Sequence, residues 1–227
     1  MSSESVETIF LFVPNLIDYG RVVFAFAAFY FMQTNYQLAA FLYLLSGFLD
    51  SFDGHAARVL NQGSKLGAML DQLIDRFTTM CLMAALCFFY PKYMLFFQFS
   101  MTVDIVSHWF HLQSSLMKGA GSHKVLDLSA NPILRHYYHN KIILFLMCSG
   151  NELFYCLLYV RYFTSGPAVF GSIGLVTALL YPCGLVAFLK TIISILQLYS
   201  AMANVAAIDV ADRAALRTSE NNAKKIS

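Results

Sequence analysis

Four aspartates stand close together in an otherwise apolar chain, and their residue type points to metal chemistry. They are Asp50, Asp53, Asp71 and Asp75. An ionised aspartate at the centre of a bilayer helix costs about 2.5–3.5 kcal/mol on insertion scales, so four of them need a cationic partner. Carboxylate oxygens are the ligands that magnesium and manganese prefer in proteins. We therefore expect all four side chains to hold divalent metal.

The first two aspartates share one face of a helix with three further residues. Asp50, Asp53, Gly54, Ala57 and Arg58 stand at i, i+3, i+4, i+7 and i+8. These intervals place their side chains on the same side of a helix. The face combines carboxylates, a glycine and a guanidinium, so it can serve both a metal ion and a phosphate.

A second helix repeats this arrangement. After a gap of eight residues, Gly67, Asp71 and Asp75 stand at i, i+4 and i+8. The intervening residues 61–65 have turn composition, so they can fold the two helices into an antiparallel pair whose carboxylates meet. On both helices roughly 20 Å of apolar sequence, at about 1.5 Å per residue, leads away from the aspartates. The carboxylates should therefore lie at one depth, within one leaflet of a membrane.

The composition of the whole chain is typical of a membrane protein. Of 227 residues, 58% are hydrophobic and 12% are charged, and the mean hydropathy is +0.60. We expect a single all-α domain over 1–227, a polytopic membrane protein with about six transmembrane helices and no cleaved signal peptide. Its N-terminus, 1–12, and its tail, 201–227, which is expected to form a short helix that frays, should be cytosolic. The expected spans are 14–33, 37–60, 67–90, 92–117, 137–161 and 170–200.

Basic residues are concentrated on one side of these spans. Most border the 61–67 turn, the 118–136 loop or the tail, whereas Lys92 and Arg161 lie on the opposite side. The positive-inside rule then places both termini and the mouth of the carboxylate site in the cytosol. The net charge of +2 gives no reason to expect nucleic acid as a partner. Five cysteines form no CxxC pair and are expected to be small core residues.

The two helix faces together carry a signature of eight specified residues. In full it reads Asp50-x2-Asp53-Gly54-x2-Ala57-Arg58-x8-Gly67-x3-Asp71-x3-Asp75. At every fixed position it resembles the signature of the CDP-alcohol phosphotransferases. Four further segments resemble animal members of that family whose acceptor is myo-inositol: FLFVPNLIDYGR at 10–21, SHWFHLQSS at 107–115, NPILRHYY at 131–138 and GNELFYCLLY at 150–159. The resemblance covers most of the chain.

This resemblance implies a six-helix membrane fold, usually a homodimer, that carries out a transfer reaction. The phosphatidyl group of CDP-diacylglycerol would pass to myo-inositol with release of CMP, and magnesium or manganese, as two ions, would be the cofactor. Asp50, Asp53 and Asp71 would bind metal, while Asp75 would also lie near a metal and accept the proton of the attacking hydroxyl. The last four residues, KKIS, resemble a dilysine retrieval signal, so the expected location is the endoplasmic reticulum membrane, with the active site facing the cytosol.

Six residues are expected to bind the CDP-diacylglycerol donor, and most have a plainer alternative. The two glycines would let the ligand approach the helices closely, or would only let helices pack together. The arginine would contact phosphate oxygens or only snorkel, and the serine would offer a hydroxyl or only form the turn. The asparagine would contact cytidine or only cap the first helix. The six are Gly54, Ala57, Arg58, Ser64, Gly67 and Asn15.

Polar residues after the third span are candidates for the myo-inositol site, because an uncharged polyol needs hydroxyl-directed donors and acceptors. For those on the fourth span the alternative is a polar contact between helices, and a zinc site is not expected without further ligands. For the basic ones the alternative is a positive-inside role. The main candidates are Ser107, His108, Lys124, Asp127 and Arg135, followed by Asp104, His111 and Asn131.

Other charged residues receive structural interpretations. Asp18 and Arg21, at i and i+3, are interpreted as a surface ion pair, so Arg58 and Arg76 are the only cations expected near the carboxylates. Lys190, within the last span, would either snorkel or pair with Glu152.

Two other functions stay open. Transfer to another alcohol, such as glycerol 3-phosphate, should require an extra cluster of basic residues for the acceptor phosphate. A divalent-metal transporter should have carboxylates along a path through both leaflets. This chain confines its carboxylates to one side and pairs them with Arg58, which favours a phosphate ligand.

Overall fold

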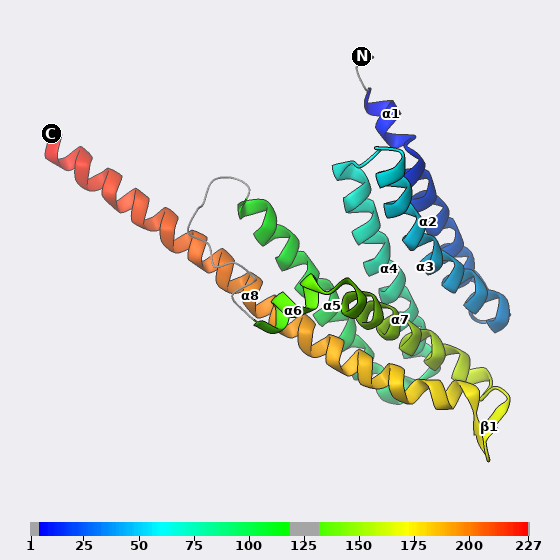
Figure 1. Cartoon of the computed structure of the whole chain (residues 1–227). Coiled ribbons are helices and arrows are strands. Elements are labelled where there is room, and N and C mark those ends of the chain that lie inside the picture. Colours follow the sequence, from blue (N-terminus) through cyan, green and yellow to red (C-terminus); the bar gives the residue numbers. More distant parts are fainter. Residues whose placement is uncertain (1–4, 119–131, 227) are drawn as a thin grey trace. The chain divides into compact units, whose positions relative to one another are not determined.

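The computed structural model describes residues 5–118 and 132–226, and almost all of them are helical (Figure 1). An all-α fold is thereby confirmed, apart from one small antiparallel hairpin of β1 and β2 that was not predicted. The elements are α1 (Val6–Phe10), α2 (Val13–Phe31), α3 (Tyr36–Val59), α4 (Lys65–Phe89), the 3-10 turn η1 (Pro91–Tyr93), α5 (Met94–Lys118), α6 (Pro132–His139), α7 (Lys141–Phe163), β1 (Ala168–Phe170), β2 (Ile173–Gly174) and α8 (Leu175–Ile226).

Packing divides the chain into two units. The first comprises Met1–Met101 and Glu152–Cys183, and the second comprises Thr102–Asn151 and Gly184–Ser227. Helices α5, α7 and α8 contribute residues to both units. All of the signature lies in the first unit, and the single domain over 1–227 stays a prediction.

Local sequence explains where the helices that carry the signature begin and end. Pro14 stands in the first turn of α2, where its missing N–H would have had no helical partner. Asn35 caps α3, since its Oδ1 accepts the N–H of Leu38 at 3.1 Å. Asn61 follows α3 with a φ of +52°, a left-handed conformation that asparagine tolerates and that ends the helix. Ser64 then caps α4.

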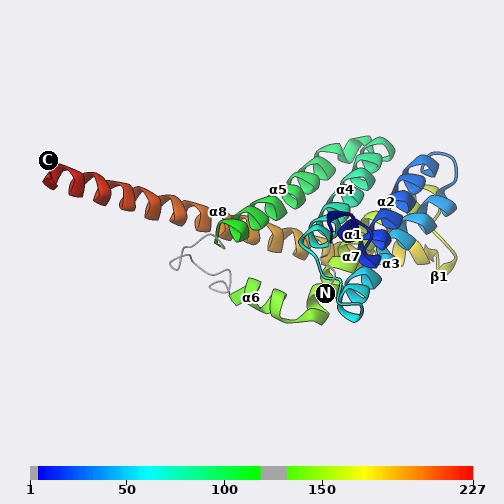
Figure 2. The same cartoon turned by 90° about the horizontal axis from the view of Figure 1, so that it is seen from above.

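Helix α2 packs against both α3 and α4, and the two views in Figures 1 and 2 show the three side by side. Their halves that lie away from the signature form the buried core of the first unit, with residues such as Met32, Tyr43 and Leu86. Tyr159 of α7 joins this core and donates its hydroxyl to the backbone oxygen of Met32 at 2.9 Å. The core therefore holds the helices together at one end, and the signature residues lie toward their other ends.

The first four predicted spans correspond to α2, α3, α4 and α5, with their ends displaced by a few residues. The prediction of one helix over 137–161 is wrong at its start. Asn140 separates α6 from α7, and its Oδ1 accepts the N–H groups of Ile142 and Ile143 at 3.0 and 3.2 Å. Because this cap begins a new helix, α7 starts at Lys141.

The last predicted span, 170–200, is wrong at both ends. Its start is occupied by the hairpin, in which Gly171 adopts a φ of +59° between β1 and β2. Helix α8 begins at Leu175 and continues without a break to Ile226. The described part of the tail is therefore helical, as predicted, but it continues the last span and is not a separate short helix. The predicted N-terminal segment 1–12 likewise contains a short helix, α1.

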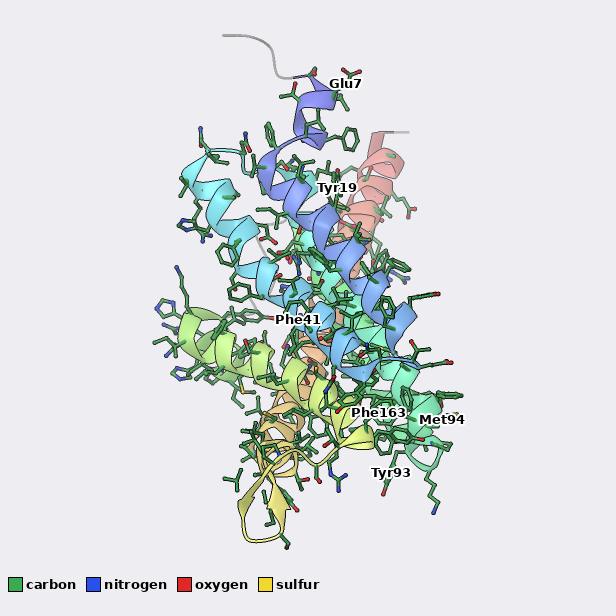
Figure 3. All side chains as sticks on the ribbon, turned by 90° about the vertical axis from the view of Figure 1, so that its right-hand side faces the viewer. Glu7, Tyr19, Phe41, Tyr93, Met94 and Phe163 are labelled. Carbon is green, nitrogen blue, oxygen red and sulfur yellow. The ribbon has the colours of Figure 1, made fainter. Side chains whose placement is uncertain are left out.

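The surface of the helices fits a lipid environment. Helices α4, α7 and α8 are long and apolar enough to cross a membrane. Large aromatic side chains are exposed along the first unit, among them Phe26, Phe41 and Phe88, each at least 60% exposed, and Figure 3 labels Phe41. Such apolar exposure is unfavourable in water and favourable in lipid. The fold is that of a polytopic all-α membrane protein, and the number of six spans stays a prediction.

Candidate metal and nucleotide site

The four signature aspartates converge on one volume in the first unit, and Arg21 of α2 lies at its centre. Arg21 Nη2 lies 2.5 Å from Asp50 Oδ1 and 2.6 Å from Asp75 Oδ1. Arg21 Nη1 lies 2.9 Å from both Asp53 Oδ2 and Asp71 Oδ1. One guanidinium on α2 thus bridges carboxylates from both α3 and α4.

A fifth carboxylate belongs to this cluster. Asp18 Oδ1 lies 3.1 Å from Arg21 Nη1, and both side chains are only 2% exposed. The prediction of a surface ion pair is therefore correct about the pair and wrong about the surface, because α2 turns this face toward α3 and α4. The hydroxyl of Ser46 on α3 also donates to the backbone oxygen of Arg21 at 2.9 Å, which ties α2 to α3 at this level. We call Arg21 and the five aspartates the carboxylate site.

The carboxylate site has the donor atoms of a divalent-metal site. Oxygen atoms of Asp18, Asp53 and Asp71 lie within 4.8 Å of one another, and so do those of Asp50, Asp71 and Asp75. Oxygens at this separation can bind one ion jointly, and hard carboxylate ligands suit magnesium and manganese. The residues therefore fit a divalent metal, and Asp71 belongs to both groups.

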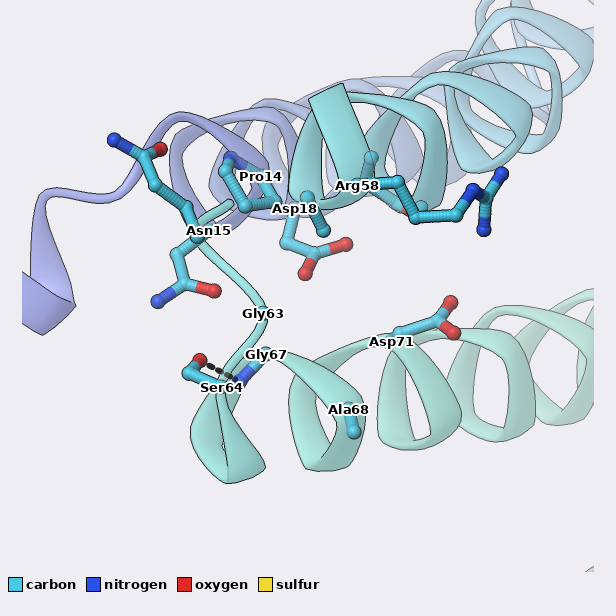
Figure 4. Close-up of a pocket in the computed structure, with 13 residues that line it drawn as sticks. Pro14, Asn15, Asp18, Arg58, Gly63, Ser64, Gly67, Ala68 and Asp71 are labelled. Atoms are coloured by element: carbon cyan, nitrogen blue, oxygen red, sulfur yellow. Dashed lines mark hydrogen bonds between the residues drawn. The ribbon is translucent and has the colours of Figure 1, made fainter. Parts of the chain in front are cut away.

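Beside the carboxylate site lies a cavity of about 260 Å³, lined by residues of α2, α3, α4 and the turn before α4 (Figure 4). Asp18, Asp53 and Asp71 form part of its wall. The structure also brings together around it all six residues predicted to bind the donor: Asn15, Gly54, Ala57, Arg58, Ser64 and Gly67. We call this space the donor cavity.

The two glycines of the donor cavity differ in the room around them. A Cβ at Gly67 would lie 2.6 Å from Asn15 Oδ1 and 3.2 Å from Ser64 Oγ, so a side chain fits only if its neighbours move. A Cβ at Gly54 would meet Arg58 Nη1 at 3.5 Å, which is an ordinary contact. Close packing within the protein therefore explains the glycine at 67 and gives no reason for the one at 54.

Ser64 has a structural role that leaves its proton available. Its Oγ accepts the N–H of Gly67 at 2.9 Å and caps α4. A hydroxyl that accepts one bond can still donate its hydrogen to another acceptor. The N-terminus of α4, the positive end of the helix dipole, also lies at the cavity, and such an end favours an anion.

Asn15 places an unsatisfied acceptor at the donor cavity. Its Nδ2 donates to the backbone oxygen of Ile9 at 2.6 Å, which fixes the orientation of the amide. Its Oδ1 is buried and accepts no hydrogen bond from the described residues. The alternative of a helix cap is wrong, because Phe12 occupies the N-cap position of α2.

The arginines around the site differ from expectation. Arg58 is exposed at the mouth of the donor cavity (Figure 4) and forms no ion pair with a carboxylate in the described part of the chain. Arg76 Nη2 lies 3.6 Å from Asp75 Oδ2. The expectation that these two are the only nearby cations is wrong, since Arg21 makes the closest contacts.

The main acceptor candidates that the structure describes are Ser107 and His108 on α5 and Arg135 on α6, all in the second unit. Ser107 Oγ donates to the backbone oxygen of Asp104 at 3.1 Å. His108 Nδ1 lies 2.7 Å from the same oxygen and 3.5 Å from the Asp104 carboxylate. These contacts run along one turn of α5.

The remaining acceptor candidates are distributed differently. The His111 ring stacks on Tyr138 of α6, with 5.9 Å between ring centroids, which is a contact between helices through the rings. The predicted alternative of a polar contact stays a prediction. Arg135 is exposed on α6. Lys124, Asp127 and Asn131 lie outside the described residues.

Lys190 and Glu152 each have contacts of their own. The ammonium of Lys190 lies 5.3 Å from the centre of the Tyr137 ring, a cation–π contact within the second unit. Glu152 accepts the hydroxyls of Tyr43 and, at 2.9 Å, Thr79 within the first unit. Glu152 is thereby held by two neutral donors.

Comparison with known proteins identifies the family. A family model described as CDP-alcohol phosphatidyltransferase matches residues 11–131. A protein of Homo sapiens named CDP-diacylglycerol--inositol 3-phosphatidyltransferase is 56% identical over 92% of this chain and 97% of its own. Proteins of the same name from Drosophila melanogaster and Saccharomyces cerevisiae are 47% and 40% identical, over 91% and 74% of this chain and 90% and 76% of their own. The chain therefore belongs to the CDP-alcohol phosphatidyltransferase family.

Proposed function

We propose that this protein transfers the phosphatidyl group of CDP-diacylglycerol to myo-inositol and releases CMP. The relatives described above are named for this reaction, and the human one matches nearly the full length of both chains. The observation that carries the proposal is the donor cavity, which adjoins two groups of carboxylates able to hold metal. A cytidine diphosphate needs polar contacts for its base, cationic contacts for its phosphates and metal at the phosphorus under attack.

Asn15 is proposed to recognise the cytosine base. The exocyclic amine of cytosine is a hydrogen-bond donor. The buried Oδ1 of Asn15 is an acceptor that no described residue satisfies, and leaving such a group unpaired costs about 1–3 kcal/mol. Binding of cytidine would relieve this cost, whereas uridine presents an acceptor at the same position and would not.

The phosphates of the donor are proposed to lie between Arg58 and the start of α4. Arg58 is free to form a bidentate contact with phosphate oxygens, because no ion pair with a described carboxylate holds its guanidinium. The Ser64 hydroxyl and the dipole of α4 add a donor and a partial positive charge on the facing wall. Gly54 and Ala57 have small side chains, so a large ligand can approach the backbone of α3 at this point.

Phosphoryl transfer requires positioning and charge stabilisation more than covalent chemistry. Asp50, Asp53 and Asp71 are the proposed ligands of magnesium or manganese, which as two ions would neutralise the pyrophosphate and the leaving oxygen. Asp75 is proposed to accept the proton of the inositol hydroxyl while the new O–P bond forms and the P–O bond to CMP breaks. Arg76 lies 3.6 Å from Asp75 and helps to orient its carboxylate.

The acceptor side and the cellular setting are also proposals. Ser107, His108 and Arg135 of the described chain, with Lys124 and Asp127, are proposed to contact inositol through hydroxyl-directed hydrogen bonds. The distribution of basic residues supports an active site that faces the cytosol, and the dilysine sequence at the C-terminus supports the endoplasmic reticulum membrane. A homodimer is proposed because members of this family are usually dimeric.

The test is CMP release by the purified protein in detergent, with CDP-diacylglycerol and manganese and with myo-inositol, glycerol 3-phosphate or no acceptor. We expect release that depends on inositol and yields phosphatidylinositol. Release that depends on glycerol 3-phosphate would keep the family and overturn the acceptor. No release with any acceptor, from folded protein that takes up manganese, would contradict the transfer reaction and support metal transport instead.

A further inference from the structure

The guanidinium of Arg21 covers the oxygens of both potential metal groups at once. Its Nη1 contacts Asp18, Asp53 and Asp71, which are the three members of the first group, at 2.9–3.1 Å. Its Nη2 contacts Asp50 and Asp75, two of the three members of the second group, at 2.5–2.6 Å. Each terminal nitrogen thus lies where the carboxylates of one group meet.

A metal ion and this guanidinium would compete for the same atoms. Magnesium binds oxygen ligands at about 2.0–2.1 Å and needs several of them around one ion. Oxygens of Asp18, Asp53, Asp71 and Asp75 accept N–H groups of Arg21, and these are oxygens that would have to turn toward a metal. Asp50 Oδ1 lies 2.5 Å from Arg21 Nη2. Metal binding therefore requires Arg21 to give up part of these contacts.

Without metal, Arg21 is the principal cation of the carboxylate site. Five carboxylates meet there, and Arg21 is the one basic side chain in the described chain that contacts all five of them. Asp18 and Asp53 are buried, and the other three carboxylates are 37–45% exposed. Unpaired carboxylates at this separation repel one another and destabilise the fold. Arg21 is itself only 2% exposed, so carboxylates rather than water surround its charge.

We propose that Arg21 is an internal counter-ion that holds the metal-free site in place of divalent cations and withdraws from part of it when metal binds. Arg21 is then a positioning residue that lowers the affinity of the site for metal while keeping the empty site folded. The inference rests on the proposed metal site and adds a residue to it. It also gives Asp18 a function, since Asp18 lies one turn from Arg21 and can retain the guanidinium after the other carboxylates have turned to metal.

Two opposite effects distinguish this role from a merely structural one. Removal of the guanidinium should weaken the metal-free protein and at the same time strengthen metal binding. A residue that only supports the fold would weaken both when it is removed, because a distorted site binds metal less well. The two quantities must therefore be measured on the same samples.

The experiment uses the full chain in detergent with manganese as the probe. Manganese binding is measured from the electron paramagnetic resonance signal of the free ion, and the unfolding midpoint is measured with and without manganese. The variants are Arg21→Met, which keeps the side-chain volume, and Arg21→Lys, which keeps one charge but lacks the fork that spans both groups. Arg161→Met is the matched control, since Arg161 is exposed on α7 of the same unit.

For Arg21→Met we expect the manganese Kd to fall at least about tenfold and the metal-free midpoint to fall by at least about 5 °C, with recovery in saturating manganese. Arg21→Lys should lie between Arg21→Met and the parent protein, and it provides the measurement if Arg21→Met folds only with metal. An unchanged or weaker manganese affinity in Arg21→Lys would overturn the proposal. A parent protein that takes up no manganese would instead contradict the metal site of the proposed function.

Discussion

The carboxylate site and the polar residues of α5 differ in how their side chains are held. Every aspartate of the carboxylate site is fixed by Arg21, and four of the five belong to a different helix from it. On α5, Ser107 and His108 contact the backbone oxygen of Asp104, about one turn earlier in the same helix. A contact between helices fixes a side chain relative to other elements, whereas a contact within one turn fixes only its rotamer. Chemistry that needs precise geometry should therefore depend more steeply on the first region.

The sharpest test of this difference replaces one aspartate in each region. Asp75→Asn should lower CMP release at saturating substrates about 10³-fold, because an amide cannot accept the proton of the attacking hydroxyl. Asp104→Asn should raise the KM for inositol by less than about tenfold, because its side chain would act only through hydrogen bonds. Both effects are measured as initial rates of CMP release.

The loss of activity can be compared between the two variants only if both are folded. The unfolding midpoint of Asp75→Asn should stay close to that of the parent protein, and Asp209→Asn, on the exposed part of α8, serves as the control for an isosteric loss of charge. Retained turnover in folded Asp75→Asn would remove Asp75 from the mechanism. A loss in Asp104→Asn as large as that in Asp75→Asn would remove the distinction between the two regions.

The next test replaces one exposed arginine in each region. Arg58→Gln should raise the KM for CDP-diacylglycerol by about 10–100-fold, since a charged hydrogen bond to phosphate contributes about 1.5–3 kcal/mol. Arg135→Gln should raise the KM for inositol only about threefold, because inositol carries no charge. Neither change should move the unfolding midpoint, since both side chains are exposed. Arg161→Gln is the control, and a donor KM that Arg58→Gln leaves unchanged would contradict phosphate binding by Arg58.

Within the donor cavity, the two glycines separate packing from ligand binding. Gly67→Ala should reduce the free energy of unfolding by about 1–3 kcal/mol, because its Cβ would lie 2.6 Å from Asn15 Oδ1. Gly54→Ala has room, and in a helix interior it should stabilise the protein by up to about 1 kcal/mol. If the donor approaches α3 at this point, Gly54→Ala should nevertheless raise the KM for CDP-diacylglycerol. Equal losses of stability in both variants would contradict the difference in packing.

Periodicity explains why the sequence predicted the donor side so closely. Within a helix, spacing alone decides which residues share a face, so the intervals between Asp50, Asp53, Asp71 and Asp75 were enough to predict that their side chains meet. It was then necessary only that the chain reverse direction in the turn at 61–65, so that the two helices lie antiparallel. Asn15 was a candidate only through its place at the start of the first span, because no spacing rule connects it with residues of another helix.

Arg21 shows where that reasoning stops. Its spacing from Asp18 fits an ordinary surface pair, and the sequence does not state which face of α2 turns toward α3. The signal was nevertheless present, since a charged pair inside an apolar segment carries the same cost that identified the four aspartates. The break at Asn140 and the length of α8 were missed for a related reason: a single capping residue, and a polar helical continuation beyond an apolar span, give only weak signals in hydropathy.

The smallest effects should come from one serine in each region. They test whether a single hydrogen bond within one helical turn contributes to stability or to substrate binding. Ser64→Ala should lower the free energy of unfolding by about 1 kcal/mol, because it removes the cap of α4. Ser64→Thr should restore it, since threonine also accepts the N–H of Gly67.

Ser107→Ala removes a bond to a carbonyl that already belongs to a helix, so its unfolding free energy should change by less than about 0.5 kcal/mol. If Ser107 contacts inositol, its loss should still raise the inositol KM several-fold, by about 1 kcal/mol of binding, while the donor KM stays constant. The two variants should thus have opposite effects: the loss of Ser64 should lower mainly the stability, and the loss of Ser107 should weaken mainly the binding of the acceptor. An inositol KM that Ser107→Ala leaves unchanged would remove this residue from the acceptor site and leave α5 with a purely structural serine.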